Sequence, residues 1–251
     1  MIKDLRSGRL WHTIKPDKGF MMKDLRSAPD ETSSWLRVLI FLFILLISLP
    51  VAAHVNTPEL ENLSRTDIFF VYLQLGFTHI LPLGFDHILF ILSLFLLSPQ
   101  LKTIVWQATA FTVAHSITLG LAMYNVVSAP SHIVEPIIAL SIAFVAVENI
   151  ISEKLRPSRV LIVFGFGLIH GLGFAGVLKD LGLPAKDYLN ALVSFNIGVE
   201  LGQLSIILAA WFLFAKWFRH KTWYRSRIVN PLSAVIAIVA LYWTIQRAFF
   251  P

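Results

Sequence analysis

The chain has 251 residues, of which 56% are hydrophobic and 14% charged, and its mean hydropathy of +0.71 excludes a soluble domain in favour of a multi-span membrane protein. The absence of cysteine excludes disulfides, thiolate metal sites and catalytic thiols, so a bound metal must be held by nitrogen and oxygen. The formal charge of +6 is divided between a basic leader and basic membrane-flanking loops, which excludes a nucleic-acid partner as its cause.

Residues 1–53 are predicted to form a leader and signal peptide. The first apolar run, Val38–Leu49, is 12 residues long, which is short for a membrane span. It follows basic residues and leads into Pro50-Val51-Ala52-Ala53, the small-residue pattern of a cleavage site. We therefore expect the mature chain to begin at His54.

Residues 54–83 are predicted to form a short periplasmic segment with a surface-lying or partly inserted helix. The stretch 67–82 is apolar but runs into Pro82 and Gly84, which should break a helix at that point.

Residues 84–251 are predicted to form the transmembrane domain, an all-α polytopic bundle. Six apolar stretches are long enough to serve as spans. They cover residues 84–98, 103–123, 132–152, 159–178, 188–215 and 228–247.

The distribution of lysine and arginine orients these spans. Nine of the 13 Lys and Arg residues after Ala53 fall in the loops near Lys102, Lys154 and Lys216, which identifies those loops as cytoplasmic. A seventh full span at 67–82 would invert this bias. The pattern predicts a bacterial inner-membrane protein whose mature amino and carboxyl termini both face the periplasm.

Ionisable side chains within or at the ends of these apolar stretches are the strongest functional signal. A central Asp, Lys or Arg costs about 2.5 to 3.5 kcal/mol on insertion scales, so such residues indicate function by default. They are of metal-ligand and proton-carrier types and include no Lys or Arg. The set is Asp86, His87, His115, Glu135, Glu148, His170 and Glu200.

Helix rise places most of this set in the outer half of the membrane. Their convergence predicts a mixed nitrogen and oxygen site suited to nickel, zinc, cobalt or copper(II). Glu148 lies near the cytoplasmic end of its span, where pairing with the basic loop is the simpler interpretation. His79, near the outer surface, either recruits ions or is solvated.

Each candidate also has a structural interpretation. His87 either binds metal, with Asp86 fixing its tautomer, or belongs to a helix cap. His115 either binds metal or bridges helices through hydroxyl groups, and the glycines around His170 also suit close helix packing. Glu200 shares one helix face with two amides, which forms either a polar path or an interhelical hydrogen-bond stripe. The amides are Asn196 and Gln203.

Three tracts of the chain resemble the HupE/UreJ family of membrane proteins. They are Gly76-Phe-Thr-His79-Ile-Leu-Pro-Leu-Gly84-Phe-Asp86-His87-Ile-Leu-Phe90, Ala114-His115-Ser116 and the tract around His170-Gly171. The resemblance covers most of residues 68–247. It implies a permease for nickel or cobalt, or an accessory protein for nickel enzymes, with His79, Asp86, His87 and His170 as the motif residues.

The leading interpretation is a divalent-metal permease without enzymatic activity, which carries nickel, cobalt or zinc from the periplasm. One alternative is an intramembrane zinc hydrolase, with His87, His115 and His170 as ligands and Asp86 or Glu200 activating water. The other is a metal-binding accessory protein that does not transport. Expected partners are the metal ion, lipid, nickel-enzyme maturation proteins and further copies of the chain. The sequence contains no glycine-rich phosphate-binding loop, so transport driven directly by ATP hydrolysis is unsupported.

Overall fold

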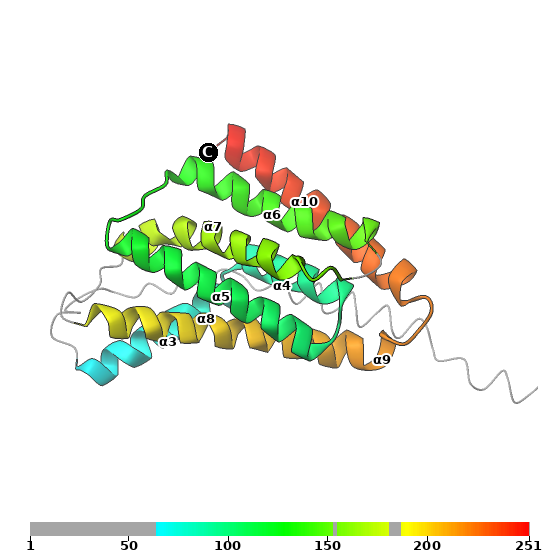
Figure 1. Cartoon of the computed structure of the whole chain (residues 1–251), viewed down its shortest axis with the longest axis horizontal. Helices are drawn as coiled ribbons and strands as arrows, with labels where there is room; N and C mark the ends of the chain where they lie inside the picture. The colour runs from blue at the N-terminus through cyan, green and yellow to red at the C-terminus, as the bar shows by residue number, and fades with distance from the viewer. Residues whose placement is uncertain (1–63, 153–154, 181–186, 251) are drawn as a thin grey trace, which may run out of the picture. The chain divides into compact units, whose positions relative to one another are not determined.

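The protein is described by a computed structural model, which covers residues 64–152, 155–180 and 187–250. All regular elements in these ranges are helices (Figure 1). They are α3 (Arg65–Ile80), α4 (Phe85–Leu97), α5 (Leu101–Met123), α6 (Ser131–Ile151), α7 (Arg159–Asp180), α8 (Tyr188–Ala210), η3 (Trp211–Ala215), α9 (Lys216–Phe218), η4 (Arg225–Val229) and α10 (Asn230–Phe249). The leader and signal peptide expected over 1–53 lie outside the described residues.

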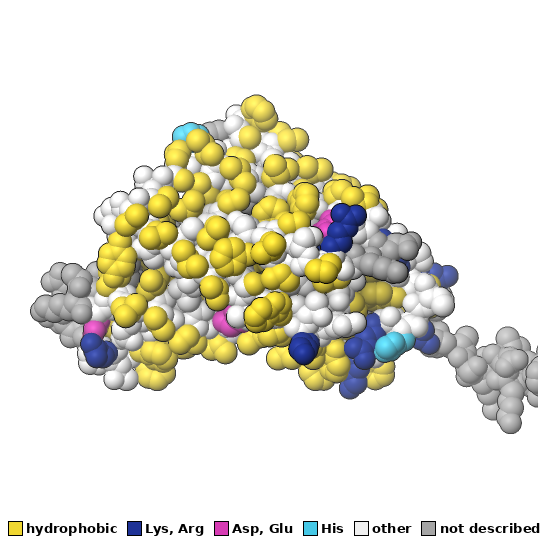
Figure 2. All heavy atoms as spheres, in the orientation of Figure 1, with side chains coloured by type: hydrophobic (Ala, Val, Ile, Leu, Met, Phe, Trp, Pro, Cys, Tyr) yellow, Lys and Arg dark blue, Asp and Glu magenta, His cyan; other side chains and the backbone are white. Residues whose placement is uncertain are grey.

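The expected membrane helix bundle is confirmed. Five helices within the described ranges are long and apolar enough to cross a bilayer, namely α5, α6, α7, the continuous stretch Tyr188–Phe218 and the stretch Arg225–Phe249. A sixth crossing is available if α3 and α4, which meet at a bend of 66°, count as one broken span. Figure 2 shows apolar side chains over most of the visible face, as a lipid-facing surface requires.

Helix α3, for which the sequence predicted a surface-lying or partly inserted helix, packs lengthwise along α8. Arg65 at the start of α3 pairs with Asp187 at the start of α8, with 3.0 Å between the charged atoms. Further along, Gly76 lies against the backbone of Phe195, and Gly198 lies against the backbone of Leu73. The two helices therefore run parallel, and small residues at their contact allow the backbones to approach.

The expected break between α3 and α4 is confirmed at Pro82 and Gly84. Helix α3 ends at Ile80, where the Leu81 N–H still donates to the Phe77 carbonyl at 2.8 Å. Gly84 precedes α4, and a Cβ at this position would collide with the His79 carbonyl oxygen. Only glycine fits here, and the turn holds the last residues of α3 against the first residues of α4.

Helix α4 continues from the break to the opposite end of the bundle. The Ser93 carbonyl accepts a hydrogen bond from the Asn149 amide at 2.7 Å, and the Asn149 oxygen accepts one from Arg159 at 3.1 Å. Arg159 also pairs with Glu148 at 3.3 Å, as the position of Glu148 near a basic loop suggested. Helices α4, α6 and α7 are therefore tied together near the ends at which α6 finishes and α7 begins.

We call this region the basic end, because it holds most of the described cations. They are Lys102, Arg156, Arg159, Lys216, Arg219, Lys221, Arg225 and Arg227. The pair α3–α4 thus extends from the end marked by Arg65 and Asp187 to the basic end. The break at Pro82 lies between the two ends, within the bundle.

Candidate metal centre

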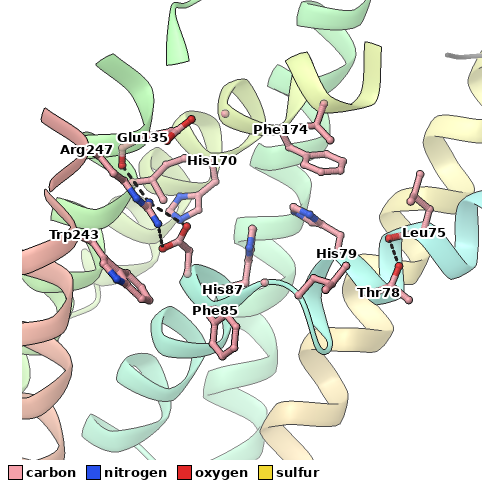
Figure 3. Close-up of a pocket in the computed structure, with 16 residues that line it drawn as sticks. Leu75, Thr78, His79, Phe85, His87, Glu135, His170, Phe174, Trp243 and Arg247 are labelled. Atoms are coloured by element: carbon pink, nitrogen blue, oxygen red, sulfur yellow. Dashed lines mark hydrogen bonds and ion pairs between the residues drawn. The ribbon is translucent and has the colours of Figure 1, made fainter. Parts of the chain in front are cut away.

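Four histidines from four helices meet at this break. His79 is in the last turn of α3 and His87 in the first turn of α4, while His115 and His170 lie near the middle of α5 and α7. One ring nitrogen from each of His79, His87 and His115 lies within 4.8 Å of the others. The His170 ring is 5.3 Å from the His87 ring, centroid to centroid. The side chains of His79, His87 and His170 point toward a common space (Figure 3).

The imidazole nitrogens in this cluster are buried and mostly without hydrogen bonds. The Nε2 atoms of all four histidines, and Nδ1 of His115, have no partner among the described residues. Asn196 is close enough to His115 to interact electrostatically, but not with hydrogen-bond geometry. Burying polar atoms without partners is costly. A metal ion bound between the rings would satisfy these nitrogens.

His170 is oriented by its own helix. Its Nδ1 lies 2.9 Å from the carbonyl oxygen of Phe166. Because a carbonyl only accepts, Nδ1 carries the proton, which leaves the lone pair of Nε2 free toward His87. This backbone contact is the kind of outer interaction that fixes the tautomer of a metal-binding histidine.

Glycines on α7 bring His170 close to α5. A Cβ at Gly167 would meet the carbonyl of Phe111, and a Cβ at Gly171 would meet the carbonyl of His115. The sequence suggested either helix packing or metal binding for this tract. In the structure the glycines allow α7 to pack closely against α5, which places His170 and His115 at the same height along the bundle.

A cavity of about 650 Å³ adjoins the cluster. Its lining includes His79, His87 and His170, whereas His115 lies behind them and is fully buried. Glu135 in the first turns of α6 and Arg247 in the last turns of α10 also line it (Figure 3). The cavity therefore extends from the histidines toward the end of the bundle opposite the basic end.

Asp86 lines the same cavity but pairs with Arg247. Its two carboxylate oxygens accept from the two guanidinium nitrogens, each at 3.1 Å. The Arg247 guanidinium also lies over the Trp243 ring at 5.3 Å and reaches the Glu135 carbonyl at 3.5 Å. Sequence reasoning did not assign Arg247 a role. The available signal was an arginine at the end of a span, which calls for a carboxylate partner.

Glu200 and Gln203 are separate from the histidine cluster, whereas Asn196 on the same helix lies close to His115. Glu200 accepts a hydrogen bond from the Thr109 hydroxyl at 2.6 Å, and Gln203 accepts one from Thr112 at 3.3 Å. Asn196 donates to the Leu192 carbonyl of its own helix at 2.8 Å. These residues lie along the contact between α5 and α8, and their predicted roles in metal binding or a polar path stay predictions.

Removing either charge of the Asp86–Arg247 pair should change metal affinity in opposite directions. We expect Arg247→Gln to strengthen nickel binding and Asp86→Asn to weaken it, each by about tenfold, because each alters the potential in the cavity by one charge. Isothermal titration of the purified protein measures both. Arg65→Gln is the matched control, since it removes an exposed cation 14 residues earlier on the same helix as His79, about 21 Å away. Equal affinities for all variants would contradict an electrostatic role of this pair.

Comparison with known proteins gives one match. The family model described as HupE / UreJ protein matches residues 55–247, which is most of the chain and includes all four histidines. No curated protein and no solved structure matches the chain. The chain belongs to the HupE/UreJ family.

Proposed function

We propose that this protein is an inner-membrane permease for a divalent transition metal, with nickel as the first candidate and cobalt and zinc next. One observation carries the proposal, namely the cluster of four imidazoles with unpartnered buried nitrogens at a break between two helices. Helix breaks of this kind provide substrate sites in transporters, where irregular backbone lines a cavity within the membrane. Nickel and cobalt follow from what the family resemblance implies.

The donor set supports an ion of intermediate softness. Imidazole nitrogen suits nickel, zinc, cobalt and copper(II), and the chain has no thiolate to favour copper(I) or an iron–sulfur cluster. Glu135 and Asp86 add carboxylates to the cavity wall. These carboxylates attract a cation, and the histidines hold it after it has lost part of its water.

The direction of transport follows from charge and cavity. The cavity extends away from the basic end, and basic loops are typical of the cytoplasmic side. An ion therefore enters from the periplasm, on the side of both mature termini, and moves toward the cytoplasm. Nickel-enzyme maturation proteins are the expected acceptors there, and a second copy of the chain is a further candidate partner.

A second candidate function is an intramembrane zinc hydrolase. The observation that favours it is the volume of the cavity, about 650 Å³, which exceeds the needs of a bare ion, next to three histidines and the Glu135 carboxylate. Three nitrogen ligands with one open position are typical of catalytic zinc. In this reading the protein is an enzyme and the cavity holds its substrate.

Metal uptake distinguishes these functions. We expect the purified protein to bind about one nickel, cobalt or zinc ion per chain, and liposomes containing it to accumulate that ion down a gradient. Binding without accumulation would instead support an accessory protein. Zinc-dependent cleavage of a lipid or peptide, lost in His87→Phe, would support the hydrolase. A protein that binds none of these metals would overturn the whole assignment.

A further inference from the structure

A second polar group lies between α5 and α8, apart from the histidine cluster. Two side chains of α8, Glu200 and Gln203, reach across to two hydroxyls of α5, Thr109 and Thr112. On each helix the two residues are three positions apart and thus lie on one face. Four oxygen-bearing side chains therefore share a short stretch of this helix contact.

Two polar atoms of this group are free to bind a ligand. Oε2 of Glu200 is buried and has no hydrogen-bond partner among the described residues, and the same holds for Nε2 of Gln203. The Gln203 side chain as a whole is 1% exposed. If its amide were turned over, the oxygen would be left without a partner instead of the nitrogen. An unpartnered carboxylate oxygen of the half-buried Glu200 and an unpartnered amide of the buried Gln203 are therefore available at this helix contact.

The group also lies on the way from the histidines to the basic end. Thr112 and Thr109 precede His115 on α5 by three and six residues, or about 4.5 and 9 Å of helix rise. Helix α5 begins at the basic end, so both hydroxyls are closer to that end than His115 is. On α8, Glu200 and Gln203 follow Asn196 in the same direction.

The other side of the cluster is closed to a cation. Phe90 and Phe111 pack against His170 at 5.5 and 4.9 Å, ring centroid to ring centroid. Both belong to a buried apolar cluster of α4, α5, α6, α7, η4 and α10, and the buried cation Arg159 begins α7. A divalent ion moving that way would find only apolar side chains before it reached Arg159, a cation already paired with Glu148. The contact between α5 and α8 offers an acid, an amide and hydroxyls.

We propose that Glu200, Gln203, Thr109 and Thr112 form an inner station that receives the divalent cation from the histidine cluster and releases it toward the basic end. The inference rests on the proposed permease function. It adds a second site, separate from the histidines, with a different donor chemistry. Oxygen donors hold nickel, cobalt and zinc less tightly than imidazoles do, so the ion passes from a capturing site to a releasing one.

Separate measurements of binding and transport test this assignment. We expect Glu200→Gln to bind nickel with the affinity of the wild type, because the histidines are intact, while nickel uptake into liposomes slows by about tenfold or more. Thr109→Val should act in the same direction and keeps the shape of the side chain if the glutamate variant is poorly folded. Ser205→Ala on α8 is the control, since its exposed hydroxyl donates to the Leu201 carbonyl of its own helix, and it should transport like the wild type.

Two results would overturn the inner station. Wild-type uptake by both Glu200→Gln and Thr109→Val would show that the ion does not use this group. Loss of equilibrium nickel binding together with uptake, in well-folded variants, would make Glu200 part of the first site. A wild-type protein that binds nickel, cobalt and zinc but transports none of them would overturn the permease itself, a failure that is visible without any variant.

Discussion

Replacing His87 by phenylalanine is expected to abolish metal binding while leaving the metal-free protein at least as stable as the wild type. His87 is central to the cluster, since its ring lies 4.7 Å from His79, 6.1 Å from His115 and 5.3 Å from His170 by ring centroids. Loss of a residue that only supports a metal ligand lowers metal affinity by up to about a hundredfold. Loss of His87, a proposed ligand, should therefore lower the affinity for nickel by at least about that factor.

Stability should not fall, because the Nε2 atom of His87 makes no hydrogen bond within the described structure. Burying such a group costs about 1 to 3 kcal/mol, and phenylalanine removes that cost. The ring also borders the cavity, which gives the larger side chain room. His115→Leu should behave alike, since both ring nitrogens of His115 lack hydrogen bonds to described residues.

Titration with nickel and thermal unfolding without metal measure the two effects on the same samples. His132→Ala is the matched control, because His132 is exposed at the start of α6 and should affect neither quantity. Wild-type affinity in His87→Phe and His115→Leu would show that the histidines are structural. A large loss of stability in the metal-free variants would show that the imidazoles contribute to folding through interactions other than metal binding.

The second large effect is expected from a single methyl group at the contact of α3 and α8. In Gly198→Ala the added Cβ would collide with the carbonyl oxygen of Leu73, and in Gly76→Ala with that of Phe195. Backbone atoms cannot move aside as side chains can, so we expect a loss of about 3 kcal/mol, the upper range for overpacking. His79 is in the last turn of α3, so metal affinity should fall together with stability.

The same substitution elsewhere provides the control. A Cβ at Gly165 or Gly176 of α7 would have no heavy atom of another described segment within 4 Å. Gly165→Ala and Gly176→Ala should therefore be neutral or stabilising, because alanine is favoured over glycine in a helix by about 1 kcal/mol. The yield of monodisperse protein and the unfolding temperature of the four variants provide the comparison. Equal behaviour of all four would contradict the packing of α3 along α8.

The position of α3 could be predicted from the sequence only in part. Composition predicted a helix up to Pro82 and a break before α4, and both were found. The Lys and Arg bias excluded an additional full span, from which we expected a surface-lying or partly inserted helix. In the structure α3 and α4 meet at a bend of 66°, and the same bias is satisfied if the pair counts as one broken span. The contact that decides this joins Gly76 to residues near Gly198, more than a hundred positions away.

For the histidines, too, the sequence predicted the individual residues but not which of them meet. An ionisable residue in an apolar stretch is costly wherever the stretch packs, so His87, His115 and His170 could be identified one by one. Which of them meet depends on how each helix is rotated about its axis, and that is set by contacts with other helices. The glycines of α7 decide it for His170.

A membrane helix bundle, the break at Pro82, the family and the residue types of a candidate nitrogen and oxygen metal site could all be predicted from the sequence. These follow from hydropathy, backbone restrictions and ligand chemistry, which are local properties. The tertiary structure alone decided that Asp86 pairs with Arg247, 161 positions away, and that Glu200 pairs with Thr109 on another helix. A buried charge requires a partner, but sequence spacing does not say which one, because the pairing is fixed by helix packing across the whole chain.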